Sequence, residues 1–161
     1  MLNTLLSELT SGDETRAEAV VPALIALGAD AIPALLDLTR STDSDQRWWA
    51  IRTLAQSPLA RTEELIPFLS DSAPEVRAAT ALALYSHPDE AAIPALIKTL
   101  SDEDSITAQL AGNALVAIGG PSVPDLLEVL KDAKQSAYSC DAPPGRDSRS
   151  SCHPGHDAGY G

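Results

Sequence analysis

The chain has 161 residues, 44% of them hydrophobic, which is typical of one globular domain. Only 4% are aromatic, and Ala and Leu dominate the apolar residues, so the composition favours closely packed helices over a β-sandwich. A formal net charge of −12 argues against binding to nucleic-acid phosphates or to an anionic membrane surface.

The absence of secretion and membrane-spanning signals in the sequence predicts a soluble protein. The N-terminal stretch MLNTLLSELTSGDETR lacks the basic start and long apolar run of a secretion signal. No apolar run reaches the roughly 18 to 20 residues of a membrane-spanning helix. Both cysteines stand near the C-terminus, so the body has no disulfide framework. We therefore expect a cytoplasmic location.

In chain order, the sequence predicts one helix at residues 1–10 and then four helix pairs. The pairs cover about 13–40, 43–70, 71–100 and 102–131. The first helix of each pair follows an acidic or Ser/Asp-rich segment, whose side-chain oxygens can accept from free backbone N–H groups. The second helix carries a proline in its first turn, where the missing N–H costs little. These prolines are Pro33, Pro67, Pro94 and Pro124.

The pairs are copies of one repeat. ALIALGADAIPALLDL (23–38) aligns without a gap with ALVAIGGPSVPDLLEV (114–129), and two further copies lie between them. The helix-initial arginines Arg16, Arg47 and Arg77 are 31 and then 30 residues apart. One helix pair cannot bury its apolar face alone, so stacked copies predict a continuous core and a domain spanning 1–132.

Residues 133–161 differ in kind. They are rich in Ser, Gly, Pro and Asp and lack a helical period, which predicts a disordered tail. The tail contains four zinc-donor residue types, at Cys140, Cys152, His153 and His156. Their spacing lacks a Cys-x-x-Cys knuckle, so we predict no metal site there. A disulfide between the two cysteines would need an oxidising setting.

The motif EVRAATALAL (75–84) followed by AAIPALIKTL (91–100) resembles HEAT repeats of the short bacterial type, similar to the phycobilisome-lyase HEAT-like family. The resemblance covers residues 1 to about 132. It implies an all-α fold, a right-handed α-solenoid of the armadillo/HEAT type with an N-terminal half-repeat cap. It also implies that first helices lie on the convex side and second helices on the concave side.

No catalytic motif is present. Nucleophile-elbow, P-loop and His-Glu-x-x-His patterns are absent, and we predict no cofactor. Relatives that act as iron-dependent deoxyhypusine hydroxylases use His-Glu pairs, and this chain has no His-Glu dipeptide. Relatives that act as bilin lyases offer no motif that matches residue by residue. HEAT-like DNA glycosylases need a basic concave face, whereas this one is predicted to be acidic.

Three sets of residues are candidates for a role. Arg16, Arg47 and Arg77 are either an anion-binding row or, as we expect, a hydrogen-bonded ladder between repeats. Positions one and four after each second-helix proline are expected to face outward on the concave side. This concave strip includes Asp37, Phe68, Asp71, Lys98, Asp125 and Glu128. It is acidic with one exposed aromatic residue, which would suit a basic peptide.

The third set is the tryptophan pair, Trp48 and Trp49. At about 100° per residue, Trp49 falls roughly 90° from the centre of the buried face, toward a neighbouring repeat, and Trp48 falls nearly opposite that centre. Arg52, four residues after Trp48, can place its guanidinium over the indole. We expect Trp49 to pack between repeats. Trp48 is either a stray surface aromatic or, with Arg52, the anchor of a convex binding patch.

The sequence therefore predicts a non-catalytic module that presents a rigid acidic surface to a protein or basic peptide. The alternative is an enzyme or enzyme subunit of the bilin-lyase or hydroxylase lineage.

Overall fold

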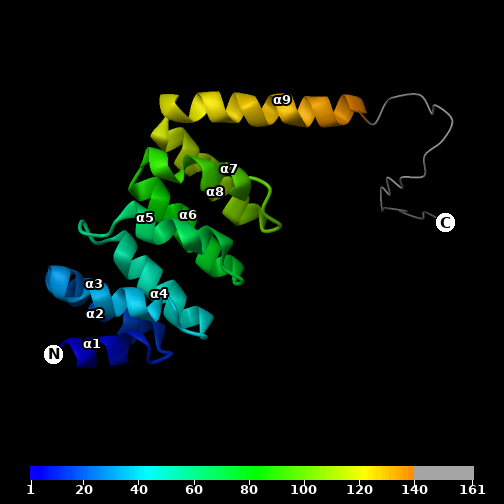
Figure 1. The fold of residues 1–161 in the computed structure, drawn as a ribbon. Coiled ribbons are helices and arrows are strands. Elements are labelled where there is room, and N and C mark those ends of the chain that lie inside the picture. Colours follow the sequence, from blue (N-terminus) through cyan, green and yellow to red (C-terminus); the bar gives the residue numbers. More distant parts are fainter. Residues whose placement is uncertain (140–161) are drawn as a thin grey trace, which may run out of the picture.

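The computed structural model describes the backbone of residues 1–139 and the side chains of residues 1–132. These residues form a stack of helix pairs with no strand in the described part of the chain (Figure 1). The helix α1 (Leu2–Leu9) comes first. The first helices of the four pairs are α2 (Glu14–Ala26), α4 (Ser44–Ala55), α6 (Pro74–Ser86) and α8 (Ser105–Ile118). The second helices are α3 (Ile32–Leu38), α5 (Thr62–Leu65) with the 3-10 helix η2 (Ile66–Ser70), α7 (Ile93–Thr99) and α9 (Val123–Ser139).

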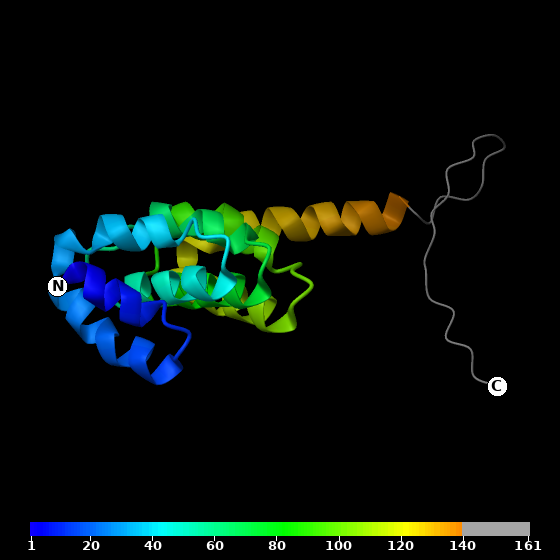
Figure 2. The ribbon, with the colours of Figure 1, turned by 90° about the horizontal axis from the view of Figure 1, so that it is seen from below.

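The two helices of a pair lie in different layers. Figure 2 shows α4, α6 and α8 in one layer and the second helices in the other. Short 3-10 turns join the layers in three of the repeats. They are η1 (Gly28–Asp30), η3 (Glu90–Ala92) and η4 (Gly120–Ser122). This is the α-solenoid that the repeated sequence predicts.

Acidic caps begin three of the four first helices. The side chains of Asp13, Asp43 and Asp104 accept from a backbone N–H in the first turn of α2, α4 and α8. The helix α6 has no side-chain cap and begins at Pro74, whose missing N–H would have had no partner there. The predicted capping is therefore present in α2, α4 and α8 but not in α6.

The core lies between the two layers. Its leucines are almost fully buried in the first three repeats, as Leu24 with Leu35, Leu54 with Leu65 and Leu84 with Leu96. Small residues let the first helices approach, because Ala81 and Ala111 are buried between α6 and α8. The apolar period of the sequence therefore specifies which face of each helix turns inward.

The last helix is longer than predicted. We expected the helical domain to stop near residue 132, but α9 continues to Ser139. Residues 133–139 hold Ala, Lys and Gln, which favour helix, whereas Pro143, Pro144 and Gly145 come later. The rest of the expected tail, residues 140–161, lies outside the described residues. So do Cys140, Cys152, His153 and His156.

Within the described residues no single helix is both long and apolar enough to cross a membrane. The segments Glu14–Ala26 and Gly28–Leu38 reach that length and composition only together, across a bend of 120°.

Candidate protein-binding surface

The two tryptophans of α4 touch each other. Their ring centroids are 4.8 Å apart and their planes meet at 86°, an edge-to-face contact. Trp49 is buried in the core and Trp48 is half-buried. Trp49 is packed in the core, but the expectation that the two tryptophans lie on different sides of the helix is wrong, because their rings touch. An indole reaches far from its Cα, so side-chain rotation can bring neighbouring rings together despite the helical turn between them.

Arg52 lies over both rings and also joins two repeats. Its guanidinium carbon is 5.3 Å from the Trp48 ring centroid and 5.8 Å from that of Trp49. Its Nε and Nη2 donate to the carboxylate of Glu18 in α2 at 3.0 to 3.2 Å. The expected cation–π contact is therefore formed. The ion pair with Glu18 was not predicted, because those residues stand 34 positions apart and no local pattern links them.

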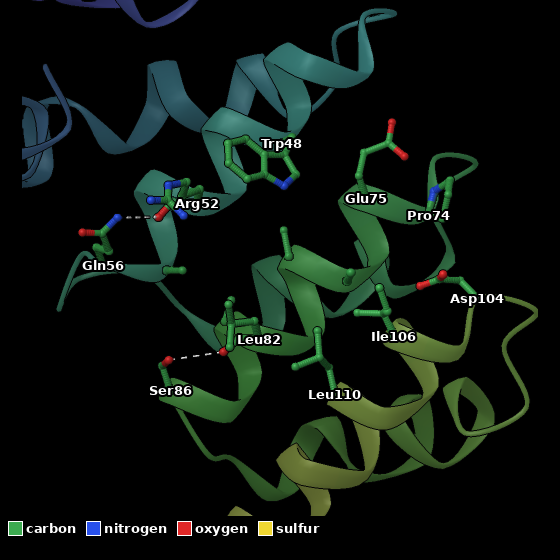
Figure 3. A pocket seen from close by; sticks show the side chains of 14 residues that line it. Trp48, Arg52, Gln56, Pro74, Glu75, Leu82, Ser86, Asp104, Ile106 and Leu110 are labelled. Atoms are coloured by element: carbon green, nitrogen blue, oxygen red, sulfur yellow. Dashed lines mark hydrogen bonds between the residues drawn. The ribbon is translucent and has the colours of Figure 1, made fainter. Parts of the chain in front are cut away.

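A groove of about 700 Å³ runs along the first-helix layer beside these residues. Ala78, Ala79 and Ala83 of α6 line it, and larger side chains stand on both sides (Figure 3). Trp48 and Arg52 of α4 are on one side, and Ile106 and Leu110 of α8 on the other. Leu82 and Ile106 are exposed within it. The lining is mostly apolar.

The groove arises from a difference between repeats. In the repeat alignment Trp48 and Trp49 correspond to Ala78 and Ala79, 30 residues later. The ring of Trp48 on α4 lies beside the methyl groups of Ala78 and Ala79 on α6. The surface is raised at α4 and low at α6.

The groove is bordered by acidic residues. Glu75 and Asp104 line one part of it. A second hollow of about 460 Å³ shares Trp48 and Glu75 with the groove and is also lined by Glu14, Asp43 and Asp45. Hydrogen bonds from the Thr107 hydroxyl and backbone N–H lower the pKa of the Asp104 carboxyl. Trp48 therefore stands between an apolar groove and an acidic hollow.

Two arginines form a ladder between repeats. Arg47 donates from Nε and Nη2 to the Asp71 carboxylate at 2.8 and 2.7 Å. Arg77 makes the same pair with Asp102, at 2.7 Å for both bonds. Each Nη1 also donates to backbone carbonyls in the linker before its own helix, such as Ser41 O and Asp71 O. Each arginine thus ties the linker before its helix to the linker before the next first helix.

Arg16 is not part of this ladder, contrary to expectation. It is exposed and pairs with Glu8 of α1 at 2.7 Å. Position 41, two residues before the Asp43 cap, corresponds to Asp71 and Asp102 but is a serine. Its hydroxyl accepts from the Asp43 N–H, as those carboxylates accept from Ala73 and Asp104. Without a carboxylate there, an arginine on α2 has no ladder partner.

The comparisons with known proteins agree with this architecture. A family model described as HEAT repeats matches residues 62–138. The chain is also similar to a solved structure, the complex of CpcE and CpcF of phycocyanin lyase from Nostoc sp. PCC7120. The identity is 26%, the TM-score is 0.65, and the match covers 81% of this chain and 88% of that chain. Residues 62–138 are thus HEAT repeats, and we refer to the chain by them as a HEAT-repeat protein.

A further solved structure, of an engineered protein, matches this HEAT-repeat protein at 27% identity with a TM-score of 0.49. That match covers 73% of this chain and 62% of the other. No curated protein sequence matches.

The residues of the predicted concave strip of this HEAT-repeat protein differ in their exposure. Asp71 was expected to face a partner, but it belongs to the ladder. Its side chain is only 9% exposed, so a partner cannot reach it. Phe68 is half-buried against the core rather than fully exposed. Asp37 is exposed and lies 3.5 Å from Arg40. Lys98, Asp125 and Glu128 are exposed.

Asp71 and Lys98 line one polar hollow of about 360 Å³, together with Arg77, Asp102 and Glu103. Two of these groups, Arg77 and Asp102, are paired with each other. Among the described residues of the HEAT-repeat protein, no group of three or more His, Cys, Asp or Glu is placed to hold a metal ion.

Proposed function

We propose that this HEAT-repeat protein binds a helical segment of a protein partner in the groove over α6, and that it does so without catalysis. The observation that carries the proposal is the groove itself, an apolar channel lined by alanines and flanked by Trp48 and Ile106. An α-helix with side chains is about 10 to 12 Å wide, and grooves between helices bind the apolar stripe of such a segment. Trp and Arg are the residue types most enriched among residues that dominate binding energies, and Trp48 with Arg52 forms one wall.

The charge near the groove indicates the chemistry of the partner. Arg52 is already paired with Glu18, whereas Glu14, Asp43, Asp45 and Glu75 surround the hollow beside Trp48. The whole chain carries a net charge of −12. An amphipathic helix with apolar residues at i, i+3, i+4 and i+7 and basic residues alongside would satisfy both surfaces.

The comparison with the phycocyanin lyase complex supports a role in protein assembly. In that structure CpcE and CpcF form a complex, and this chain matches 88% of the compared chain. Binding to another protein is thus a role found on this architecture.

A direct test uses the two tryptophans, since Trp48 and Trp49 are the only ones in the chain. A designed helical peptide with a Leu stripe and Lys flanks is titrated while the tryptophan emission is followed. We expect a saturable shift in emission and a dissociation constant that rises with salt concentration, because part of the attraction is between charges. The same peptide with Glu flanks should bind at least about tenfold more weakly.

Variants locate the binding site. Ala78→Glu places a charge at the base of the groove and should abolish binding of the Lys peptide. The Phe68→Ala/Asp37→Lys variant alters the concave strip and should bind normally. Loss of binding in the strip variant, with Ala78→Glu unaffected, would move the site to the concave side. Equal binding by the wild type and both variants would show that neither the groove nor the concave strip is the binding site.

A second candidate function is that of a subunit in a lyase of the phycocyanin type. It is favoured by the similarity to the phycocyanin lyase complex and by the groove volume, which falls within the range of small-molecule sites. A visible absorbance spectrum and an iron analysis of the purified protein test it. A bilin that co-purifies with the wild-type protein but not with the Ala78→Glu variant would support this role. Bound iron would instead indicate a redox role.

A further inference from the structure

The two ends of the groove over α6 differ in chemistry. Where α6 and α8 begin, the carboxylates of Glu75 and Asp104 line the groove (Figure 3). Where α4 and α6 end, the side chains of Gln56 and Ser86 line it. Arg52 lies on the wall four residues before Gln56. One end of the groove is therefore acidic, and the other carries amide, hydroxyl and guanidinium groups.

The acidic end remains negative when the helix dipoles are included. The hollow beside it adds the exposed carboxylates of Glu14, Asp43 and Asp45. The starts of α2, α4, α6 and α8 each contribute roughly half a positive charge. The carboxylates, two in the groove and three in the hollow, outweigh these partial charges.

Each end also has an atom that can bond to a ligand. Both hydrogen bonds from Thr107 to Asp104 end on Oδ2, and no donor among the described residues bonds to its Oδ1. Arg52 donates to Glu18 from Nε and Nη2, and its Nη1 has no acceptor in the part of the chain that the structure describes. The acidic end can therefore accept from N–H groups, and the opposite end can donate to carbonyl groups.

An α-helix has ends that complement those of the groove. Its first four N–H groups and last four C=O groups have no partner within the helix, and its dipole makes the first end positive and the last end negative. The groove follows α6 from Glu75 to Ser86, about 16 Å at the rise of an α-helix. A segment of about 12 residues, three turns long, therefore spans it.

We propose that the groove binds its partner helix in one direction. The N-terminal turn of the partner, which carries Lys or Arg, lies over Glu75 and Asp104, and its C-terminal turn lies beside Arg52. The apolar stripe between these turns contacts Ala79 and Leu82. The partner thus runs parallel to α6. This inference rests on the proposed function and adds to it the orientation of the partner and the position of its basic residues.

Two peptides of the same composition test the direction. Each has about 12 residues and a Leu stripe, with the lysines in the first turn of one peptide and in the last turn of the other. Titrations followed by tryptophan emission should show at least about tenfold tighter binding of the first-turn peptide. Helicity in free solution would give the opposite order, because cations stabilise the C-terminal end of an isolated helix.

Cross-linking locates the lysines on the protein. A carbodiimide joins a lysine Nζ to a neighbouring carboxylate as an amide, and mass spectrometry identifies the joined residues. We expect the first-turn peptide to cross-link to Glu75 and Asp104. We expect no cross-link to Glu90, which is exposed but does not line the groove.

A pair of variants tests the charges. Glu75→Gln/Asp104→Asn removes both carboxylates of the acidic end, while Asn can still cap α8. It should bring the affinities of the two peptides to within about twofold of each other. Asp89→Asn/Glu90→Gln is the matched control, because it removes the same charges from a capping residue and its exposed neighbour outside the groove. That variant should keep the preference for the first-turn peptide.

The outcomes separate this inference from the proposed function. Equal affinity of the two peptides for the wild type would overturn the single direction and leave the proposed function standing. So would an unchanged preference in Glu75→Gln/Asp104→Asn. Binding of neither peptide would overturn the proposed function and this inference with it.

Discussion

Arg77 joins three parts of the chain with one side chain. It stands on α6, its Nη1 donates to the carbonyl of Asp71 before that helix, and its Nε and Nη2 donate to Asp102 before the next first helix. The pair is 16% and 10% exposed, so water screens it little. The Asp102 carboxylate also accepts from the Asp104 N–H at 2.9 Å, which satisfies a second oxygen lone pair. Such a fully bonded pair is costly to break from one side.

Arg77→Ala should lower the free energy of unfolding by about 2–3 kcal/mol, since it leaves the Asp102 carboxylate nearly buried without its cation. Chemical denaturation followed by circular dichroism would measure this. Arg40→Ala is the control, because the Arg40–Asp37 pair is exposed and should contribute nothing measurable. Equal stabilities of Arg77→Ala and Arg40→Ala would show that the ladder does not stabilise the fold.

The ladder also predicts a pH dependence of stability. The hydrogen bonds from Arg77 lower the pKa of Asp102 below its ordinary value of 3.8. The unfolded chain therefore holds that proton more tightly than the folded chain. The stabilisation is complete above the ordinary Asp pKa and is lost as the pH falls from there through the lower folded pKa.

Asp102→Asn should accordingly flatten the fall in unfolding free energy below about pH 4, relative to wild type. Denaturation midpoints measured at several pH values would show it. A wild-type slope in Asp102→Asn would mean that other carboxylates cause the acid sensitivity.

At the scale of the element, α4 and α6 show how one repeat motif gives two different helices. Both have a ladder arginine and a buried threonine, Thr53 and Thr80, whose hydroxyls donate to the carbonyls of Trp49 and Val76. They differ at the two positions after the arginine, where α4 has indoles and α6 has methyl groups. Correspondingly, α4 lies closely against α6 but less closely against α2.

Trp49→Ala should destabilise the fold by about 3–5 kcal/mol, because Trp49 is buried and its removal leaves a cavity. Trp48→Ala should cost clearly less, since Trp48 is half-buried. Thermal unfolding of both variants compares them directly. A larger loss in Trp48→Ala would mean that the outer ring, not the inner one, holds α4 in place.

The end of α8 gives a second prediction for an element. Gly119 has φ +78°, a conformation that residues with a Cβ rarely adopt. Gly119→Ala should therefore cost at least about 1 kcal/mol of unfolding free energy. Gly120→Ala serves as the control, because an added Cβ there meets nothing within 4 Å and φ is not positive. Equal stability of the two variants would show that φ at Gly119 imposes no cost.

At the scale of the whole molecule, stability in a solenoid depends on contacts between neighbours. The helix α6 lies closely against both α4 and α8, and the ladder connects the linkers on both of its sides. The helix α2 has closer contact with α1 than with α4, and its link to α4 includes the exposed Arg52–Glu18 pair. The middle of the stack is thus held more firmly than the N-terminal repeat.

Hydrogen exchange measured by mass spectrometry should reflect this difference. We expect the backbone amides of α6 to be the slowest to exchange and those of α1 and α2 to be at least about tenfold faster, because local opening is cheapest where contacts are fewest. Addition of the Lys peptide should slow exchange in α6 and α8 without changing α2. Uniform exchange along the chain would mean that the repeats open together.

The division between sequence and tertiary structure follows the distance over which each interaction acts. Helix caps, proline positions and the apolar period are local, so the sequence determined the helix pairs, the core leucines and the solenoid. The last two turns of α9 were not predicted, because residues 133–161 were assessed as one segment. The helix-forming residues are concentrated at the start of that segment. The two arginines that form the ladder could be predicted, since their spacing repeats.

Which residues reach one another across repeats was decided only by the fold. The Trp48–Trp49 contact depends on side-chain rotation, and the Arg52–Glu18 pair joins residues 34 positions apart. In the sequence Asp71 is predicted to be an exposed acidic residue. In the structure it pairs with Arg47, because stacking brings the two linkers together. The groove is likewise a difference between stacked repeats. Each repeat contains the residues, and only their neighbours in space determine whether those residues are covered.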